Sequence, residues 1–319
     1  MRYSRLVRVG VTGVSSDLGR GLLPRLEADP LVDSIVAFDV AHPPALTRKC
    51  SFVRVDLTRP GMEAALTHAF KEQRLDALFH LAFVNSRVHR AAFAHELEVI
   101  GSMHVLAAAQ ETGLKRLIIP SLTALYGARA DGPAVCLETH PLEGAGVRFV
   151  TDRVEVEHQI EKFAVRNPDV HVVVLRFAPI VGHTSDNPFT RLLRTGFVPT
   201  ILGFDPLWQV VHEDDAVTAL HLSLTTKAEG SFNVVGDTTA PFSTIARLAG
   251  AQTMPMPGPL LRATILALES AGIASVPVPL LAFLRYSWVA DGMRARQQLG
   301  FEPRVPFQAA MASMRERRT

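Results

Sequence analysis

Residues 9–26, "VGVTGVSSDLGRGLLPRL", decide the fold that we expect for this chain of 319 residues. A β-branched run of strand length leads into a turn that contains Gly13 and Gly19, and a leucine-rich helical pattern follows. Glycines in such a turn let backbone amides come close to a phosphate at the helix N-terminus, where the helix dipole is positive. The order of strand, turn and helix therefore predicts a βα unit that binds a phosphate-containing ligand.

The alternation of strand and helix patterns continues through the first two thirds of the chain. Each apolar run has strand length and β-branched or aromatic content, and segments of helical composition such as residues 99–111 separate the runs. The expected strands lie within residues 5–13, 34–40, 51–57, 77–83, 116–122, 170–178 and 230–237. This alternation predicts an α/β fold with a doubly wound parallel sheet of the Rossmann type.

The pattern loosens after residue 182, where turn signals replace the long strand-like runs. We expect residues 1–182 with 208–236 to form a dinucleotide-binding domain, and residues 183–207 with 237–319 to form a small C-terminal substrate lobe. A helix is expected to begin near Glu213, because the carboxylates of Glu213, Asp214 and Asp215 suit the positive end of a helix dipole.

Charge and cysteine content exclude several classes of protein. Lys and Arg number 33 against 31 Asp and Glu, so the net charge of +2 gives no reason to expect a nucleic-acid partner. The two cysteines form no CxxC pair and indicate neither a disulfide framework nor a thiolate zinc site. Together with the lack of an apolar signal segment at the start, this favours the cytoplasm.

The segment of residues 258–284 is mostly apolar but is interrupted by Arg262, Glu269 and prolines. No apolar run in it reaches the roughly 18 residues that span a bilayer. We expect buried or interface helices here, with contact to a membrane surface as the alternative.

Asp39 ends the second expected strand, 20 residues beyond Gly19. A carboxylate at this place can accept hydrogen bonds from both hydroxyls of an adenosine ribose and would repel a 2′-phosphate. No Arg directly follows Asp39. NAD is therefore favoured over NADP as the cofactor.

Several blocks resemble the extended short-chain dehydrogenase/reductase family, which includes nucleotide-sugar epimerases and dehydratases. "TGVSSDLG" at residues 12–19 is similar to the family's TGxxGxxG turn, with Ser16 at the middle glycine. The blocks "HLAF", "SLTALYG", "LRFAPIVG" and "VVHEDDAV" follow in the family's order. The resemblance implies that the cofactor is contacted by Gly13, Ser15, Ser16, Asp17, Leu18, Gly19, Asp39, Asp56, Leu57, Leu81, Ala82, Phe83, Arg153, Pro179 and Ile180.

The catalytic positions of that family carry other residues in this chain. Family members use a Tyr as proton donor, a Lys four residues later, a Ser or Thr that binds the substrate oxygen, and an upstream Asn. The resemblance places at these positions, in the same order, Phe149, Arg153, Leu122 and Glu98. Phe has no proton to give, whereas Arg can still donate hydrogen bonds to a ribose. Ser121 and Thr123 flank Leu122 and are the candidates for a catalytic hydroxyl.

Trp208 and Phe149 are the expected contacts of the substrate. Nucleotide-sugar members of the family usually carry a diphosphate-clamping Arg where this chain has Trp208. A Trp there favours an apolar or aromatic ligand, with ordinary packing as the alternative. The histidines show no HxxxH or HExxH spacing, so we expect no metal site. His80, in the fourth expected strand, is interpreted as a structural residue.

Three hypotheses about function remain open at this point. The chain is an NAD-binding regulator, sensor or partner without standard catalysis, an oxidoreductase or epimerase with a non-standard acid, or a protein that acts on lipid-like ligands at a membrane surface. All three predict dinucleotide binding and a small-molecule ligand whose identity is open. By analogy with the family, residues 99–111 and 151–163 could pair in a homodimer.

Overall fold

The computed structural model describes residues 6–43, 48–83, 91–146, 148–271 and 278–315. Its main feature is a parallel sheet of seven strands in the order β11-β6-β5-β4-β1-β2-β3. From edge to edge these strands are β11 (Gly230–Val234), β6 (His171–Phe177), β5 (Arg116–Leu122), β4 (Ala77–His80), β1 (Val7–Thr12), β2 (Val32–Asp39) and β3 (Cys50–Arg54). Each lies within or overlaps a run that the sequence predicts as a strand, and the predicted α/β class is confirmed.

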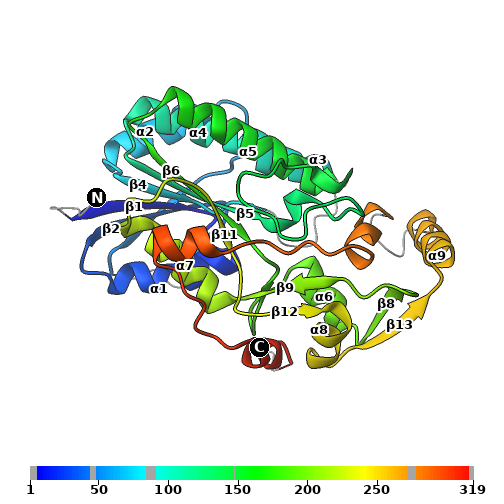
Figure 1. Ribbon diagram of the computed structural model, residues 1–319. Helices are drawn as coiled ribbons and strands as arrows, with labels where there is room; N and C mark the ends of the chain where they lie inside the picture. The colour runs from blue at the N-terminus through cyan, green and yellow to red at the C-terminus, as the bar shows by residue number, and fades with distance from the viewer. Residues whose placement is uncertain (1–5, 44–47, 84–90, 147, 272–277, 316–319) are drawn as a thin grey trace.

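Helices cover both faces of this sheet (Figure 1). One face carries α1 (Asp17–Ala28) and α7 (Glu213–Thr225). The other carries α2 (Met62–Glu72), α4 (Gly101–Thr112) and α5 (Arg148–Arg166). Because side chains alternate along a strand, Phe79 packs in the core beneath the first pair and Leu78 in the core beneath the second group. The expected helix at Glu213 is confirmed as α7.

The chain runs from β1 outward to β3 and then crosses back to β4 on the other side of β1. The direction of winding therefore changes between β1 and β4. In doubly wound sheets, ligands bind in the crevice that such a change opens at the carboxyl ends of the strands. The glycine turn follows β1 directly, so it lies at this crevice.

A smaller set of elements forms a lobe beside the carboxyl edge of the sheet. Two-stranded sheets pair β10 with β7, β12 with β9 and β13 with β8. The strands are β7 (Ile180–Val181), β8 (Phe197–Ile201), β9 (Leu207–Gln209), β10 (Val211–His212), β12 (Thr239–Pro241) and β13 (Gln252–Met256). The longer helices are α6 (Pro188–Arg194), α8 (Phe242–Leu248), α9 (Gly258–Ser270) and α10 (Phe307–Ser313). In Figure 1, β8, β13 and α9 extend away from the main sheet.

Short helical turns complete the described structure. They are α3 (Ala91–His95), the π-helical η1 (Glu96–Ile100), the 3-10 turns η2 (Thr123–Tyr126), η3 (Gly144–Gly146) and η4 (Val278–Leu284), and the π-helical η5 (Ala295–Leu299). Segments α3, η1 and α4 follow one another without a break, so Glu98 lies in the π-helical turn between two α-helices.

Core packing crosses the boundaries of the predicted two-part division at several places. Trp208 packs in the core of the lobe, although the division gives it to the dinucleotide-binding domain. Residues Leu299 and Phe301 pack in the core of the main sheet, although the division gives them to the lobe. The exact division of the chain stays a prediction.

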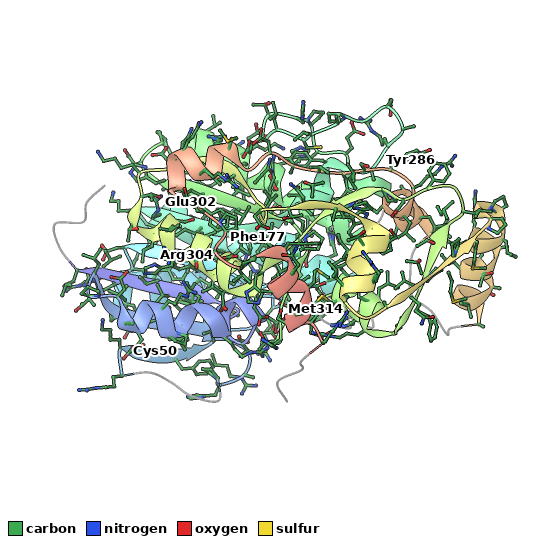
Figure 2. All side chains as sticks on the ribbon, turned by 60° about the horizontal axis from the view of Figure 1, so that its bottom comes forward. Cys50, Phe177, Tyr286, Glu302, Arg304 and Met314 are labelled. Atoms are coloured by element: carbon green, nitrogen blue, oxygen red, sulfur yellow. The ribbon has the colours of Figure 1, made fainter. Side chains whose placement is uncertain are left out.

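The C-terminal segment connects the main sheet with the lobe. The Asp215 carboxylate at the start of α7 accepts hydrogen bonds from the backbone N–H groups of Arg304 (2.9 Å) and Val305 (3.1 Å). Further along, Met314 is buried in the lobe core. Figure 2 labels Arg304 and Met314 on this path. The C-terminal segment is thus held by α7 at residues 304–305 and by the lobe core at Met314.

The apolar segment of residues 258–284 forms α9 and η4, with residues 272–277 outside the description. Leu261 and Ile265 of α9 are buried against Ile201 of β8, which agrees with the expected buried helix. Leu260 and Leu266 are about half exposed. Within the described ranges, no helix combines the length and the apolar character needed to cross a membrane.

Candidate functional site

The turn after β1 requires glycine at two positions. Gly13 has a φ of +67°, and a Cβ placed on it would lie 2.6 Å from the backbone of Ala82 in the loop after β4. A Cβ on Gly19 would lie 2.5 Å from the carbonyl oxygen of Val14. These contacts are far below the normal van der Waals separation. The turn therefore runs close to the loop after the neighbouring strand and to its own helix.

Ser16, which replaces the middle glycine of the family's turn, is the N-cap of α1. Its hydroxyl oxygen accepts a hydrogen bond from the N–H of Gly19 at 3.1 Å. Serine is one of the preferred N-cap residues, because its side chain satisfies a backbone amide that has no partner within the helix. The departure from the family's pattern thus stabilises the helix end at which a phosphate would bind.

The Asp39 carboxylate lies beside this turn at the end of β2. One oxygen accepts a hydrogen bond from the N–H of Ser15 at 2.9 Å, and the other accepts from the N–H of Val40 at 2.7 Å. These two bonds fix the carboxylate next to the start of α1. Each oxygen has two lone pairs, so both can also accept from a ribose hydroxyl. The residues present therefore fit the adenosine end of NAD.

Asp17 brings a second carboxylate to the first turn of α1. It accepts hydrogen bonds from the backbone N–H of Asp186 (3.0 Å) and from the Arg20 guanidinium. Burial raises the pKa of Asp17, and the nearby carboxylates of Asp186 and Glu213 add to this effect. The first contact connects the glycine turn with the loop that enters the lobe.

The expected cofactor contacts after β4 lie in a buried region around His80. His80 is hydrogen-bonded to the hydroxyls of Thr12 (2.7 Å) and Ser102 (3.0 Å), and its ring lies against that of Phe83. Burial lowers the pKa of His80 to about 3, and the charge of Arg153 acts in the same direction. His80 is therefore neutral at pH 7 and serves as a structural link between β1 and α4.

Two of the four residues that we expect at the family's catalytic positions form an ion pair. The Arg153 guanidinium donates to the Glu98 carboxylate at 2.8 and 3.3 Å, and both side chains are at least 94% buried. Arg153 also donates to the carbonyl oxygen of Pro120 at 3.4 Å, and its guanidinium carbon lies 3.9 Å from the centre of the Phe83 ring. The positive charge of Arg153 is thus neutralised by Glu98 next to the loop predicted to contact the cofactor.

The other two aligned positions are apolar. Phe149 lies in the first turn of α5, one turn before Arg153, and its side chain is outside the described structure. Leu122 packs against Leu125 and Val150. Among the described side chains, neither the Leu122 nor the Arg153 position offers a hydroxyl that could exchange a proton.

The candidate hydroxyls of Ser121 and Thr123 both donate to protein acceptors. Ser121 donates to the Glu157 carboxylate at 2.5 Å, and Glu157 in turn pairs with the Arg176 guanidinium at 2.7 Å. Thr123 donates to the carbonyl oxygen of Phe177 at 3.4 Å, near the centre of Figure 2. Both hydroxyls are buried in these contacts. Their catalytic role stays a prediction.

Tyr126 is the one tyrosine close to these residues in the described structure, and it belongs to the same buried network. Its hydroxyl donates to the side-chain oxygen of Asn233 at 2.7 Å and accepts from Arg176 at 2.8 Å. Burial raises the pKa of Tyr126 to about 12, against the opposing effect of Arg176. Tyr126 therefore holds its proton at neutral pH and stabilises the packing of β5, β6 and β11.

Trp208 lies in the aromatic core of the lobe. Its ring is stacked on Phe189 at a centroid distance of 5.0 Å and contacts Phe242 and Trp288 at 4.9 Å. The indole N–H donates to the carbonyl oxygen of Phe283 at 2.9 Å. With only 6% of the residue exposed, these contacts support the packing interpretation. Contact between Trp208 and a substrate stays a prediction.

The remaining expected cofactor residues lie at strand ends along the same edge of the sheet. Asp56, after β3, accepts from the hydroxyl of Thr58 at 2.6 Å, and this bond lowers the pKa of the Asp56 carboxyl. Leu57 is buried beside it. Pro179 and Ile180 follow β6, where the Pro179 carbonyl oxygen accepts from the N–H of Val211 at 3.1 Å. Their contacts with NAD stay predictions.

The structure also places His95 against Asp152, a pair that no motif in the sequence indicated. The Nδ1 atom of His95 lies 3.0 Å from a carboxylate oxygen of Asp152, across 57 residues of sequence. Only the packing of α3 against α5 brings them together. A sequence pattern confined to one helix or loop could not have shown this pair.

The sheet order, the glycine turn and Asp39 define an α/β protein of the Rossmann type with a dinucleotide-type turn after its first strand. A model of the NAD dependent epimerase/dehydratase family matches residues 9–235, and the chain belongs to this family.

Similar proteins support this assignment. An uncharacterized protein of Mycobacterium tuberculosis is 30% identical over 315 residues, which cover 95% of this chain and 81% of the relative. UDP-glucose 4-epimerase from Thermotoga maritima, solved with UDP-glucose, has a TM-score of 0.73 at 19% identity, covering 97% of this chain and 98% of that one. UDP-glucose 4-epimerase from Thermus thermophilus, solved in complex with NAD, has a TM-score of 0.73 at 20% identity, with the same coverage. The two structures establish the similarity of fold.

Proposed function

We propose that this protein binds NAD or NADH at the Gly13 turn and does not carry out the Tyr- and Lys-dependent hydride transfer of its family. The observation that carries the proposal is the buried ion pair between Glu98 and Arg153, in which both oxygens of the carboxylate accept from the guanidinium. The resemblance to the family implies that Glu98 and Arg153 stand where the family's Asn and Lys would act together with the Tyr.

The adenosine end of the site supports binding. Asp39 offers acceptors for ribose hydroxyls beside a capped helix N-terminus, where a diphosphate is favoured by the helix dipole. A 2′-phosphate would bring negative charge against the Asp39 carboxylate, so NADP and NADPH are expected to bind more weakly.

The nicotinamide end argues against standard turnover. When bound, NAD supplies a nicotinamide ring that accepts or gives a hydride, while the protein must move a proton at the substrate oxygen. Phe149 has no proton to exchange, and Tyr126 is held in the buried network with Arg176 and Asn233. Loss of one positioned general acid typically lowers a rate by about 100- to 10,000-fold. We therefore propose a role as an NAD-dependent sensor or binding partner.

The first experiment is calorimetric titration of the purified protein with NAD, NADH, NADP and NADPH, repeated with Asp39→Ala. Loss of charge-assisted hydrogen bonds of about 1.5–3 kcal/mol should weaken NAD binding by about 10- to 100-fold. Asp33→Ala is the matched control, because Asp33 lies on the same strand with an exposed side chain. Failure of all four dinucleotides to bind the wild-type protein would overturn the proposal.

Turnover is tested separately with UDP-glucose and UDP-glucuronic acid as candidate substrates. NADH absorbance detects net oxidation, and chromatography of the nucleotide sugars detects epimerisation, which regenerates NAD in each cycle and leaves the absorbance unchanged. We expect no steady turnover with either compound. A rate that responds to Ser121→Ala or Thr123→Val, with NAD affinity unchanged, would instead establish an oxidoreductase or epimerase with a non-standard acid. Membrane-surface action is tested by sedimentation with anionic liposomes, which we expect to leave the protein in the supernatant.

A further inference from the structure

We propose a binding site for a divalent transition-metal cation between α3 and α5, formed by His95, Asp152 and Glu155. The three side chains each offer a ligand atom, and these atoms all lie within 4.8 Å of one another. The site is separate from the Gly13 turn and does not depend on the proposed function.

The distances within the cluster fit coordination of one ion. Nδ1 of His95 and Oδ1 of Asp152 are 3.0 Å apart. Nitrogen and oxygen ligands lie about 2.1 Å from Zn²⁺, so two of them at an angle between 90° and 110° are about 3.0–3.4 Å apart. The His95–Asp152 pair already has this separation. A movement of about 1.5 Å would bring the third carboxylate to the same distance.

The three ligands combine fixed and adjustable positions. Asp152 is 5% exposed, whereas His95 is half-buried and Glu155 is exposed. Asp152 and Glu155 are three residues apart on the 19-residue helix α5, so they lie on the same face. His95 is the last residue of α3, on the neighbouring helix. The contact between His95 and the buried Asp152 therefore fixes the site, and the exposed Glu155 side chain can rotate to complete it.

The set of donor atoms indicates the class of cation. One imidazole nitrogen with two carboxylate oxygens suits Zn²⁺ and other first-row divalent ions better than Mg²⁺ or Ca²⁺, which prefer oxygen ligands alone. The two carboxylates also supply a charge of −2 to neutralise the ion. Three protein ligands leave a fourth position of a tetrahedral zinc site for water or an external ligand. The histidine spacings HxxxH and HExxH, which lie within one segment, predicted no metal site. The three proposed ligands come from two segments, so such spacings cannot show them.

The position of the site gives it a structural consequence. His95 is followed directly by the π-helical turn that carries Glu98, and Asp152 precedes Arg153. A cation here would join α5, which carries Arg153, to the end of α3, which continues directly into the turn that carries Glu98. We therefore expect metal binding to raise the thermal stability of the protein.

The test is equilibrium dialysis of chelator-treated, tag-free protein against Zn²⁺, Mn²⁺ and Mg²⁺, with metal content measured by mass spectrometry. The expected result is one equivalent of Zn²⁺, weaker Mn²⁺ and no Mg²⁺ at the same concentration. Zn²⁺ should raise the unfolding midpoint by a few degrees, because a ligand that binds only the folded state stabilises it. Co²⁺ in place of Zn²⁺ should give the visible absorption bands of a low-symmetry protein site.

Variants separate this site from adventitious binding. His95→Ala and Glu155→Gln should each lower the Zn²⁺ affinity at least about tenfold. Glu155 is exposed, so Glu155→Gln removes a ligand without disturbing the core. His68→Ala is the matched control, because His68 and Glu72 form an exposed pair on α2, with His68 Nε2 and Glu72 Oε2 3.9 Å apart and no third ligand among the described residues. Equal Zn²⁺ binding by the wild-type protein, His95→Ala and Glu155→Gln, or no Zn²⁺ binding by any of them, would overturn the proposal.

Discussion

The Asp39 carboxylate and the Glu98–Arg153 ion pair both lie near the carboxyl edge of the sheet, but they differ in whether their charges are paired within the protein. At the Gly13 turn, the Asp39 carboxylate accepts from the backbone amides of Ser15 and Val40 and keeps lone pairs for a further donor. At the η1–α5 contact, Glu98 and Arg153 neutralise each other in the interior. A ligand meets an available acceptor at the first place, whereas at the second it must compete with an ion pair. Binding and catalysis can therefore be lost or kept independently in this fold.

The largest expected effect comes from breaking the ion pair. Glu98→Gln leaves the Arg153 charge buried without its partner, which typically costs about 3–5 kcal/mol of unfolding free energy. Urea denaturation at pH 7 measures this loss. The double variant Glu98→Gln/Arg153→Met should recover at least half of it, because no uncompensated charge remains.

Asp39→Asn tests the stability cost of a similar change at the Gly13 turn. Asn offers one amide oxygen in place of two carboxylate oxygens, so the N–H of either Ser15 or Val40 loses its acceptor. We expect a stability loss of about 1–2 kcal/mol, below that of Glu98→Gln. If Asp39→Asn and Glu98→Gln cost the same, the two regions do not differ in the way that their contacts indicate.

The sequence predicted the first region better than the second for a physical reason. Buried parallel strands are continuous apolar runs, and the glycine turn with Asp39 is local in sequence, so both leave a pattern that can be recognised. The short strands of the lobe, such as β9 with 3 residues, are too brief to show a period. The pairing of Glu98 with Arg153 joins residues 55 apart. The resemblance to the family predicted a position for each of them but could not show that they contact each other.

Trp208 and His95 illustrate the same limit. A tryptophan at an expected ligand position predicts a ligand contact and a packing contact equally well, and only the surrounding Phe189, Phe242 and Trp288 side chains favour packing. His95 had no motif at all, because its partner Asp152 comes from another helix. Sequence patterns therefore identify the elements, while the contacts between elements need the structure.

A pair of glycine variants tests how tightly the Gly13 turn packs against the loop after β4. Gly13 and Gly113 have nearly equal φ angles of +67° and +65°, but a Cβ on Gly13 would meet the Ala82 backbone, whereas a Cβ on Gly113 would meet nothing within 4 Å. Gly113→Ala should therefore cost about 1 kcal/mol for the left-handed backbone alone. Gly13→Ala should cost about 3 kcal/mol, because the clash is added to the same strain.

Thermal or urea unfolding of both glycine variants gives the difference directly, and NAD titration shows whether the turn still binds. The Gly13→Ala protein should also lose most of its NAD affinity, while Gly113→Ala keeps it. Equal stability losses would mean that the Gly13 turn can move away from the loop after β4, and the region would be less rigid than its contacts indicate.

His80 connects the two regions, since it is hydrogen-bonded to Thr12 of β1 and to Ser102 of α4. Its pKa is lowered from 6.5 to about 3 in the folded state. Below pH 6.5 the unfolded chain therefore binds a proton that the folded protein does not, and stability falls as the pH falls. The expected loss is about 1 kcal/mol per pH unit between pH 6 and pH 4.

Urea unfolding at pH 7, 6, 5 and 4 measures this slope. In His80→Gln the slope should be smaller by about that amount, although the variant is less stable at pH 7. His68→Gln, at an exposed position on α2, should leave the slope unchanged. A His80→Gln slope equal to that of the wild-type protein would show that His80 is protonated at an ordinary pH, and the buried link would be wrong.

The smallest effect is expected at Asp17, where the first region contains a charge that opposes its ligand. The carboxylate lies in the first turn of α1, and its raised pKa shows that the surroundings disfavour the charged form. Asp17→Asn should therefore raise NAD affinity by about two- to fivefold at low salt and less at high salt, because removing a like charge favours the diphosphate. Lowering the pH toward the raised pKa should strengthen NAD binding to the wild-type protein but not to Asp17→Asn.

Calorimetry at pH 7 and pH 5 tests both statements, with Asp33→Asn as the control for a distant charge on β2. Weaker binding by Asp17→Asn would instead mean that the contacts of Asp17 with Arg20 and the Asp186 backbone hold the turn in its binding conformation.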